Sequence, residues 1–496
     1  FDMDKPVVRI SVRNLVEFIL RSGDLDNRGG SSDREAMQKG SRLHRKIQGR
    51  MGSHYRAEVS LKYKTEYEDV SIQEGRADGI FTEDGQCWID EIKGVYADVS
   101  QLEKPVEVHR AQAMCYAWIY AQEQKPEKIG VQMTYGNLDT EELKFFKEEY
   151  TLEELSLWYQ ELLDRYHKWI AYQLAWKKER NASMSDLEFP FEYREGQRKI
   201  VSGVYHTIST ERQIFVQAPT GVGKTMSTIF PAVRAVGAGL GENIFYLTAK
   251  TITRTVAEEA FSILKEHGLK FKVITITAKE KLCFCDKTEC NPENCLWARG
   301  HLDRVNDAVF ELWTTQDSYD RDTLLEYAKK WQGCPFEMCL DLAVWVDAVI
   351  CDYNYVFDPD ASLKRYFGNG AKGDYVFLVD EAHNLVDRAR EMYSAVLKKE
   401  DFLAAKKLVK EMDKRLAGAL DRCNKQLLEY KRQCDTFMVV SGLGTFPASL
   451  ERVMGLMQKF MERHKGEPVT NELLEFFFAV RHFLNMYDCA DEKYVY

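Results

Sequence analysis

The sequence lacks several features that would place it in a simple class. It has no segment with the uninterrupted apolar length of a membrane helix, and its first residues show no secretory pattern. Internal repeats and low-complexity tracts are also absent. Its 68 Lys and Arg against 78 Asp and Glu give a net charge of −10, so it is no polycation that binds nucleic acid through bulk charge. These absences predict a cytoplasmic protein with no membrane partner, in which any nucleic-acid path is a local basic groove.

What the chain does contain is a phosphate-binding pattern. The text QIFVQAPTGVGKT predicts an apolar strand, Ile214 to Gln217, followed by a glycine-rich turn and a helix. The backbone amides of residues 220–225 would face the phosphates, because free N–H groups and the helix dipole favour anions at a helix N-terminus. Lys224 would reach the β- and γ-phosphates, and the hydroxyl of Thr225 would bind Mg²⁺. The residues expected to bind ATP in this turn are Gly221, Gly223, Lys224 and Thr225.

A second apolar run, Tyr375 to Val379, is followed directly by the sequence Asp-Glu-Ala-His. The acids therefore emerge at the carboxyl end of a predicted buried strand, where open α/β sheets bind their ligands. Asp380 would hold Mg²⁺, directly or through water, and Glu381 would orient or deprotonate the attacking water. His383 would couple the nucleotide state to the nucleic-acid side.

The two motifs together resemble superfamily 2 helicases, and the text between them resembles the iron–sulfur XPD/DinG-like branch. FEYREGQRKIV is similar to the adenine-reading segment of that family, with Arg194 and Gln197 at its centre. YLTAKTITRTVAEEA is similar to the next motif, which implies that Thr248 and Lys250 lie near the DNA backbone. AVICDYNYVFDP resembles a passage that flanks the cluster domain and contains Asn354 and Tyr355. The resemblance implies an ATP-dependent helicase that moves 5′ to 3′ on single-stranded or forked DNA.

Seven of the twelve cysteines lie between residues 283 and 351. In a cytosolic protein such crowding favours metal or redox chemistry over disulfides, and the Cys-x₂-Cys pairs typical of zinc sites are absent. Spacing alone leaves the metal open, and also leaves open that the thiols are incidental. The family resemblance implies a [4Fe–4S] cluster held by four thiolates: Cys283, Cys290, Cys295 and Cys334. If one of these four is not a cluster ligand, Cys285 is the expected replacement. Cys339 and Cys351 are predicted to be buried thiols.

The distance between the motor motifs indicates an insertion. Thr225 and Asp380 are 155 positions apart, whereas three βαβ units need about 90 residues. After Asn384 the text is charged and has apolar residues at helical spacing. Its position is that of the family's helical arch, although an ordinary helical subdomain fits the periodicity equally well. The expected α/β architecture is a nuclease domain at 1–182, a RecA-like motor domain at 183–282 and 341–384, an iron–sulfur domain at 283–340 and an arch at 385–496.

The N-terminal third carries a separate chemical pattern. Residues 55–100 alternate like an antiparallel meander, with a tight turn at 83–85. On a strand of period two, Glu91 and Lys93 share one face and Asp90 points to the other. With Asp78, this gives two carboxylates and a lysine on one sheet face. Such a site suits a hard cation, Mg²⁺ or Mn²⁺, that activates water against a phosphodiester.

This pattern resembles the RecB-like branch of the PD-(D/E)XK nucleases. His44 lies on a predicted helix, where RecB-like enzymes carry a metal-binding histidine. Gln112 and Tyr116 are one helical turn apart, as in the Gln-x₃-Tyr motif of that branch. The resemblance implies that Lys93 orients the attacking hydroxide or stabilises charge, and that Gln112 and Tyr116 support the substrate strand. The metal ligands that it implies are His44, Asp78 and Glu91.

Two features of these families are expected to be missing. RecB-like enzymes with their own cluster use four cysteines, whereas this region offers only Cys87 and Cys115, so we expect no second cluster. The second RecA-like domain, with its arginine finger, is also absent from the text, so we expect nucleotide binding with little ATP turnover. The favoured hypothesis is an ATP-dependent DNA helicase coupled to a metal-dependent DNA nuclease in repair or replication. The alternatives are a catalytically idle nuclease fold that grips DNA, or an ATP-switched regulatory scaffold.

Overall fold

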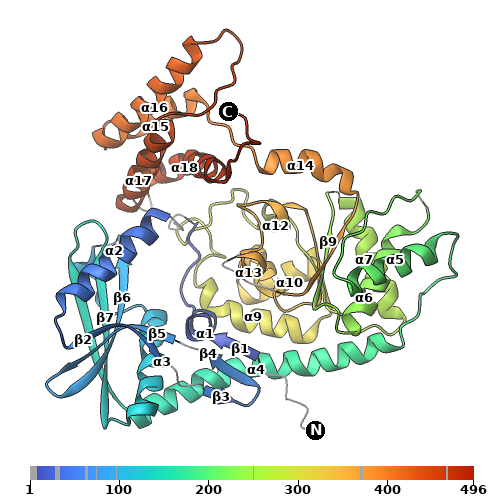
Figure 1. The fold of residues 1–496 in the computed structure, drawn as a ribbon, viewed down its shortest axis with the longest axis horizontal. Helices are drawn as coiled ribbons and strands as arrows, with labels where there is room; N and C mark the ends of the chain where they lie inside the picture. Colours follow the sequence, from blue (N-terminus) through green and yellow to red (C-terminus); the bar gives the residue numbers. More distant parts are fainter. Residues whose placement is uncertain are drawn as a thin grey trace. The chain divides into compact units, whose positions relative to one another are not determined.

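The computed structural model describes residues 8–27, 34–61, 65–73, 75–96, 98–219, 221–249, 251–368, 373–464 and 467–496 (Figure 1). They form two compact units. The first comprises the described residues within 1–25, 29–178 and 299–310, and the second those within 26–28, 179–298 and 311–496. Within the described ranges, every helix is too short or too polar to cross a membrane.

The first unit is built around a five-stranded sheet in the order β2-β5-β6-β7-β8. β6 and β7 are parallel, and α3 (Glu107–Gln124) connects them, whereas the other neighbours are antiparallel. The strands are β2 Tyr55–Leu61, β5 Gly75–Glu83, β6 Gln86–Val95, β7 Lys128–Asn137 and β8 Leu143–Thr151. The unit also contains α1 Val12–Ile19, α2 Arg34–Arg50 and the 3₁₀ turn η2 Val99–Gln101.

The predicted meander is only partly correct, because a second sheet interrupts it. β3 (Thr65–Tyr67) and β4 (Val70–Gln73) pair with each other and with β1 (Val8–Ser11) in the order β1-β4-β3. They lie between β2 and β5 in the sequence, yet they pair with the N-terminal strand. The alternating pattern predicts strands but does not state which sheet each strand joins.

The predicted tight turn is confirmed and fixes the register of the site. β5 ends at Glu83 and β6 begins at Gln86, which leaves a two-residue turn. Asp84 and Gly85 have φ angles of 50° and 82°, the left-handed backbone that tight hairpins require and that Asp-Gly tolerates. The turn sets the pairing of Gly79 with Asp90.

The second unit contains a fully parallel sheet in the order β11-β10-β12-β9-β13. Its central strands are apolar and buried, as strands covered on both faces must be. This confirms the α/β class. The strands are β9 Asn243–Leu247, β10 Val273–Thr275, β11 Ser318–Tyr319, β12 Ala348–Cys351 and β13 Tyr375–Val379. The helices are α5 Gln197–Ser209, α6 Lys224–Gly237, α7 Thr251–Glu266, α8 Lys279–Leu282, α10 Arg321–Trp331, α11 Pro335–Ala343, α12 Asn354–Phe357 and α13 Lys364–Phe367.

One predicted strand is wrong. Residues 212–219 form no strand, and Ile214, Phe215 and Val216 are 44%, 91% and 38% exposed. β13 is the end strand of the sheet, and none of the described residues pairs with its outer edge. The predicted burial of β13 is likewise incomplete, because Val376 is buried but Phe377 is 42% exposed. An apolar run becomes a buried parallel strand only where other elements cover both its faces.

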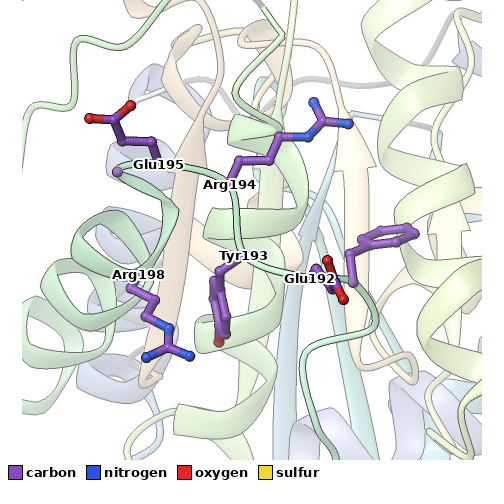
Figure 2. Close-up of a pocket in the computed structure, with 7 residues that line it drawn as sticks. Glu192, Tyr193, Arg194, Glu195 and Arg198 are labelled. Atoms are coloured by element: carbon purple, nitrogen blue, oxygen red, sulfur yellow. The ribbon is translucent and has the colours of Figure 1, made fainter.

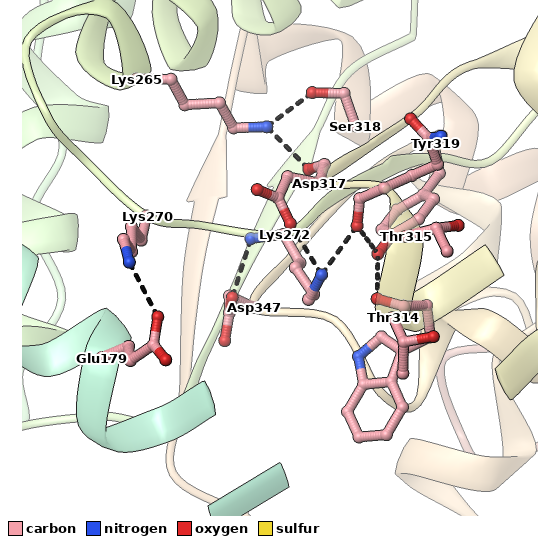
Figure 3. Close-up of polar contacts among 12 residues, drawn as sticks. Glu179, Lys265, Lys270, Lys272, Thr314, Thr315, Asp317, Ser318, Tyr319 and Asp347 are labelled. Atoms are coloured by element: carbon pink, nitrogen blue, oxygen red, sulfur yellow. Dashed lines mark hydrogen bonds and ion pairs between the residues drawn. The ribbon is translucent and has the colours of Figure 1, made fainter. Parts of the chain in front are cut away.

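A buried polar network ties the second unit together at the start of its strands (Figure 3). Lys272 is 1% exposed and donates hydrogen bonds to the Gln316 carbonyl and to Asp317 Oδ1, both at 2.7 Å. Arg180 donates to Asp347 Oδ1 at 2.7 Å, and both side chains are about 5% exposed. These contacts fix the ends of two long helices, α4 (Leu152–Ser185) and α9 (His301–Thr315), which contribute residues to both units.

The residues after β13 are helical, as their periodicity predicts. The segment begins with the 3₁₀ turn η3 Ala382–Asn384 and continues through α14 Leu385–Met392, α15 Lys399–Val409, α16 Lys414–Arg432, α17 Phe446–Arg463 and α18 Pro468–Cys489. α15 to α18 bury their apolar faces against one another around Phe402, Leu420, Val453 and Val480. Asp413 starts α16 by accepting a hydrogen bond from the Leu416 amide at 2.9 Å. The segment therefore has a core of its own.

Candidate functional site

The glycine-rich turn directly precedes α6. Gly221 and Gly223 have φ angles of 87° and 78°, which glycine adopts without steric cost. Helix α6 begins at Lys224, so the free amides of its first turn lie beside these glycines. Lys224 Nζ donates to the Ala218 carbonyl at 3.1 Å. Thr220 lies outside the described residues.

Two side chains of the segment 194–197 hydrogen-bond to the backbone of this turn. Gln197 is buried and donates through Nε2 to the Val222 carbonyl at 2.6 Å, while Arg194 donates to the Gly221 carbonyl. The Gln197 side chain also accepts from the Arg194 amide at 2.7 Å. Arg194 and Gln197, which resemble an adenine-reading pair, therefore contact the glycine-rich turn directly.

A shallow pocket of 610 Å³ lies along residues 191–198 (Figure 2). Tyr193 and Arg198 project to one side of this segment, with the guanidinium 5.0 Å from the ring centre. Tyr193 also stacks on Phe189 at 4.3 Å between ring centres. Both Phe189 and the Arg198 guanidinium therefore pack against the Tyr193 ring. Tyr193 and Arg198 were not predicted from the sequence, although they flank Arg194 and Gln197.

Tyr246, at the carboxyl end of β9, connects the glycine turn to the acidic strand end. Its side chain lies close enough to both Thr225 and Asp380 for them to act on its pKa. Burial and, second, the charge of Asp380 raise the pKa of Tyr246, so its hydroxyl stays protonated. Burial, followed by the neighbouring Glu381 charge, raises the pKa of Asp380, and Lys224 partly offsets this. The structure thus brings Lys224, Thr225 and Asp380 to one place, where a cation would relieve the carboxylate.

Glu381 and His383 lie at the exposed rim of this place. Glu381 has a φ of 48°, and its backbone carbonyl accepts a hydrogen bond from Tyr353 Oη at 3.1 Å. His383 Nδ1 lies 3.4 Å from Glu381 Oε2, and the imidazole is 73% exposed. The Glu381 carboxylate is therefore held near Asp380 but remains open to water. Of the two positions expected near DNA, Thr248 is 2% exposed and bonded to the Thr253 hydroxyl, and Lys250 lies outside the described residues.

Three cysteines of the predicted cluster, Cys283, Cys290 and Cys295, lie in the loops before α9, and the fourth, Cys334, directly precedes α11. Cys285 Sγ lies 3.8 Å from Cys295 Sγ, and burial, Cys295 and then Cys283 raise the pKa of Cys285 to about 12. Cys290 and Cys334 are near Lys279: burial lowers the pKa of Lys279, but the nearby Cys290 and, less strongly, Cys334 contribute to raising it overall. Five thiols and one ammonium thus share a region of the second unit, a donor set that fits a thiolate-held cluster. Cys339 and Cys351 are fully buried.

In the first unit, strand register creates a second candidate site. Gly79 pairs with Asp90, so the next pair outward sets Asp78 opposite Glu91 on the same face. Asp90 serves the other face, where its carboxylate accepts from Thr134 Oγ1 at 2.6 Å and from Tyr55 Oη at 2.8 Å. The alternation expected from the sequence is therefore present, and the two adjacent acids have different surroundings.

The carboxylates of this face meet a histidine from α2. His44 Nδ1 lies 3.6 Å from Asp78 Oδ1, and Asp78 Oδ2 accepts from the Ile92 amide at 2.8 Å. Glu91 is 2% exposed, and its Oε1 accepts from Lys93 Nζ at 2.9 Å. Its Oε2 is buried without a hydrogen-bond partner among the residues that the structure describes. An unsatisfied buried carboxylate oxygen is costly, so this site fits a bound cation.

The electrostatics agree with that fit. Burial raises the pKa of Glu91 to about 7, with Asp78 adding to the rise and Lys93 opposing it. Burial acts against protonation of His44, but the nearby Asp78 carboxylate raises its pKa overall. A divalent cation would replace protons on both groups. Oxygen ligands with one imidazole suit Mg²⁺ or Mn²⁺.

Gln112 and Tyr116 extend the site along α3. Lys93 Nζ donates to Gln112 Oε1 at 3.2 Å, and Gln112 Nε2 donates to Tyr116 Oη at 3.1 Å. Gly75 allows the ring of Tyr116 to lie against β5, because a Cβ there would sit 2.2 Å from a ring carbon. All six residues expected to form the nuclease site are therefore connected through space in one unit.

Glu58, on β2, is a further carboxylate at this site that was not predicted from the sequence. A Glu58 oxygen lies within 4.8 Å of the ligand atoms of His44 and Asp78. The signal was the position of Glu58 on the strand that precedes Asp78, but finding it requires the pairing of β2 with β5.

Comparison with known proteins covers the central part of the chain. Residues 248–402, which include Asp380, match the DEAD_2 family model. A Fanconi anemia group J protein homolog of Gallus gallus is 35% identical over 103 residues, which are 21% of this chain and 8% of the relative. A regulator of telomere elongation helicase 1 homolog of Caenorhabditis briggsae is 23% identical over 257 residues, covering 43% of this chain and 26% of the relative. A solved XPD helicase structure is 16% identical at a TM-score of 0.40, covering 60% of this chain and 51% of that one.

The chain spans 8% and 26% of the length of these two curated relatives. The sequence matches support the helicase part of the resemblance: the central residues are similar to XPD-like superfamily 2 helicases.

Proposed function

We propose that this chain carries the nucleotide-binding half of an ATP-driven DNA helicase motor joined to a metal-dependent DNA nuclease. The observation that carries the motor part is the meeting of Lys224, Thr225 and Asp380 around Tyr246. The similarity of residues 248–402 to helicases supports DNA as the partner.

In the motor site, each group has a distinct role. The amides beyond Gly221 and Gly223 bind phosphate oxygens, and Lys224 places a positive charge beside them. Thr225 and Asp380 hold the Mg²⁺ that accompanies ATP and neutralises its phosphate charge. Glu381, which is open to water, orients the attacking water molecule. By resemblance, the motor moves 5′ to 3′ on single-stranded or forked DNA, with a [4Fe–4S] domain and a helical arch beside the strand.

The motor proposal is tested by equilibrium binding of a fluorescent ATP analogue in the presence of Mg²⁺. Lys224→Ala should weaken binding by roughly tenfold or more, since a hydrogen bond to a charged group contributes about 1.5–3 kcal/mol. Lys407→Ala, at an exposed position on α15, is the matched control and should bind like the unchanged protein. Equal affinity for all three proteins would refute a phosphate-binding turn.

We further infer that the first unit cuts DNA. Two observations favour it: the buried Glu91 Oε2, which has no partner among the described residues, and the approach of His44 to Asp78. These residues would hold Mg²⁺ or Mn²⁺, which supplies an activated water for phosphodiester hydrolysis. Lys93, fixed between Glu91 and Gln112, would stabilise the charge that develops on the phosphate.

A cleavage assay on single-stranded and forked DNA separates an active nuclease from an idle fold. Cutting should require Mg²⁺ or Mn²⁺ and should fall by roughly a hundredfold or more in Lys93→Ala, because a preorganised charge at the transition state is lost. Lys128→Ala, an exposed lysine on β7, should cut normally. DNA binding that persists in Lys93→Ala, with no cutting by any variant, would instead favour the idle fold.

A further inference from the structure

Glu58 occupies an unusual place in β2. The pairing of β2 with β5 is regular on either side of it, with Ala57 opposite Gly79 and Val59 opposite Ala77. Glu58 itself has a φ of 52°, a left-handed backbone that costs a residue with a side chain roughly 1–2 kcal/mol. A glutamate is thus held in a conformation that would suit glycine better, in the middle of a strand.

The local contacts direct this carboxylate toward the nuclease face. Gln48 Nε2, from the same helix as His44, donates to Glu58 Oε1 at 3.1 Å and to the Asp78 carbonyl at 2.9 Å. The ligand atoms of Glu58, His44 and Asp78 all lie within 4.8 Å of one another. The other Glu58 oxygen lies 2.8 Å from Arg76 Nε, an exposed pair of the kind that contributes little to stability.

An independent observation points to a ligand at the same place. Glu91 is 2% exposed, its Oε2 has no partner within the described part of the chain, and its charge acts on both His44 and Asp78. With Glu58 included, three carboxylates face two cationic groups, the Lys93 ammonium and the Arg76 guanidinium. Such a surplus of negative charge is compensated when a divalent cation is bound.

We propose that Glu58 is a direct ligand of the divalent cation, together with His44, Asp78 and Glu91. This inference rests on the proposed nuclease function. Three carboxylates and one imidazole form a site that prefers Mn²⁺ over Mg²⁺, because a nitrogen ligand suits the transition metal better. Gln48 is a positioning residue that aims the Glu58 carboxylate.

The test measures Mn²⁺ binding directly, through the loss of the free Mn²⁺ signal in electron paramagnetic resonance, and needs no activity. The unchanged protein should bind Mn²⁺ at this site, and Asp78→Asn should abolish that binding. Glu58→Gln should weaken the affinity by roughly tenfold or more, since even groups outside the first ligand shell can contribute that much. Glu68→Gln is the matched control, because Glu68 is also an exposed glutamate at a positive φ, 49°, in the same unit.

Two further variants separate a ligand from a structural residue. Arg76→Gln breaks the ion pair but leaves the carboxylate, so it should bind Mn²⁺ at least as tightly as the unchanged protein. Glu58→Gly relieves the backbone strain, so it should melt no lower without metal, yet it should lose Mn²⁺ affinity as Glu58→Gln does. These two variants keep the test decisive even if Glu58→Gln folds poorly.

The outcomes distinguish the inference from the function beneath it. If Asp78→Asn abolishes Mn²⁺ binding while Glu58→Gln and Glu58→Gly keep full affinity, Glu58 is no ligand and the nuclease site stands. If Arg76→Gln weakens binding as much as Glu58→Gln, the ion pair is what matters and the inference is again overturned. If the unchanged protein binds no Mn²⁺, the proposed metal-dependent nuclease fails as well.

Discussion

Gln197 Nε2 lies 2.6 Å from the Val222 carbonyl, and a Cβ added to Gly223 would lie 2.6 Å from the same nitrogen. One side chain therefore both braces the phosphate turn and occupies the space that any larger residue at 223 would need. Gly221 has a similar φ, but a Cβ there would meet open space. The two glycines of the motif are thus required for different reasons.

This difference predicts unequal effects of two alanine substitutions. Gly221→Ala carries only the left-handed strain of about 1–2 kcal/mol, whereas Gly223→Ala also displaces Gln197. We expect Gly223→Ala to lose more affinity for a fluorescent ATP analogue than Gly221→Ala. Adding Gln197→Ala to Gly223→Ala should restore part of the loss, because the crowding is removed. Equal affinities for the two single variants would contradict this account.

The raised pKa of Glu91 predicts a pH-dependent stability. In the metal-free folded protein Glu91 keeps its proton up to about pH 7, whereas in the unfolded chain it releases the proton near its usual value of 4.5. The folded state therefore binds more protons between these values, so the free energy of unfolding should fall as pH rises from 4.5 to 7, by up to about 3 kcal/mol. Urea unfolding of the unchanged protein and of Glu91→Gln at pH 5, 6, 7 and 8 measures it.

Glu91→Gln removes the titrating group and should flatten this part of the pH dependence. Saturating Mn²⁺ should reduce the fall in the unchanged protein, because the metal stabilises the ionised carboxylate. Parallel pH curves for the two proteins without metal would show that Glu91 does not titrate in this range.

Breaking the buried ion pair between Arg180 and Asp347 is expected to lower the stability of the protein strongly. Asp347→Ala leaves Arg180 charged and buried, and removes the acceptor of the Lys272 amide. Removing one partner of such a pair costs about 3–5 kcal/mol. Glu179→Ala breaks the exposed pair with Lys270 and should cost less than about 1 kcal/mol. Thermal unfolding of both variants tests the contrast, which fails if the two melt alike.

The thiol-rich loops predict iron. Protein purified without oxygen should be brown and contain about four irons and four sulfides per chain. Cys283→Ser, Cys290→Ser, Cys295→Ser and Cys334→Ser should each lose iron. Cys285→Ser tests the substitute, since Cys285 Sγ lies 3.8 Å from Cys295 Sγ. Stoichiometric zinc in place of iron would contradict the predicted cluster. If Cys285→Ser loses iron and one of the four other variants keeps it, Cys285 is a cluster ligand in place of that cysteine.

Much of both sites could be predicted because their residues are fixed by local pattern. The Asp84-Gly85 turn sets the register, and the register alone sets Asp78 opposite Glu91. Gly221 and Gly223 carry a backbone that few other residues adopt. The failures concern contacts that depend on distant segments. Phe215 has the apolar character of a strand residue, yet it is 91% exposed because no described element covers it. The sequence does not place Glu58 near Asp78, because that proximity depends on the pairing of β2 with β5.

The contacts of Asp90 on one face of strand β6 fix the position of Glu91 on the other face. Asp90 is fully buried and held by Tyr55, Gln132 and Thr134, so β6 cannot slide by one residue without moving that carboxylate into the opposite layer. A slide would also place Asp90 where Glu91 now lies in the proposed metal site. The buried Asp90 thus fixes the alignment of Glu91, so a substitution at Asp90 would also disturb the proposed nuclease site although no residue of that site had changed.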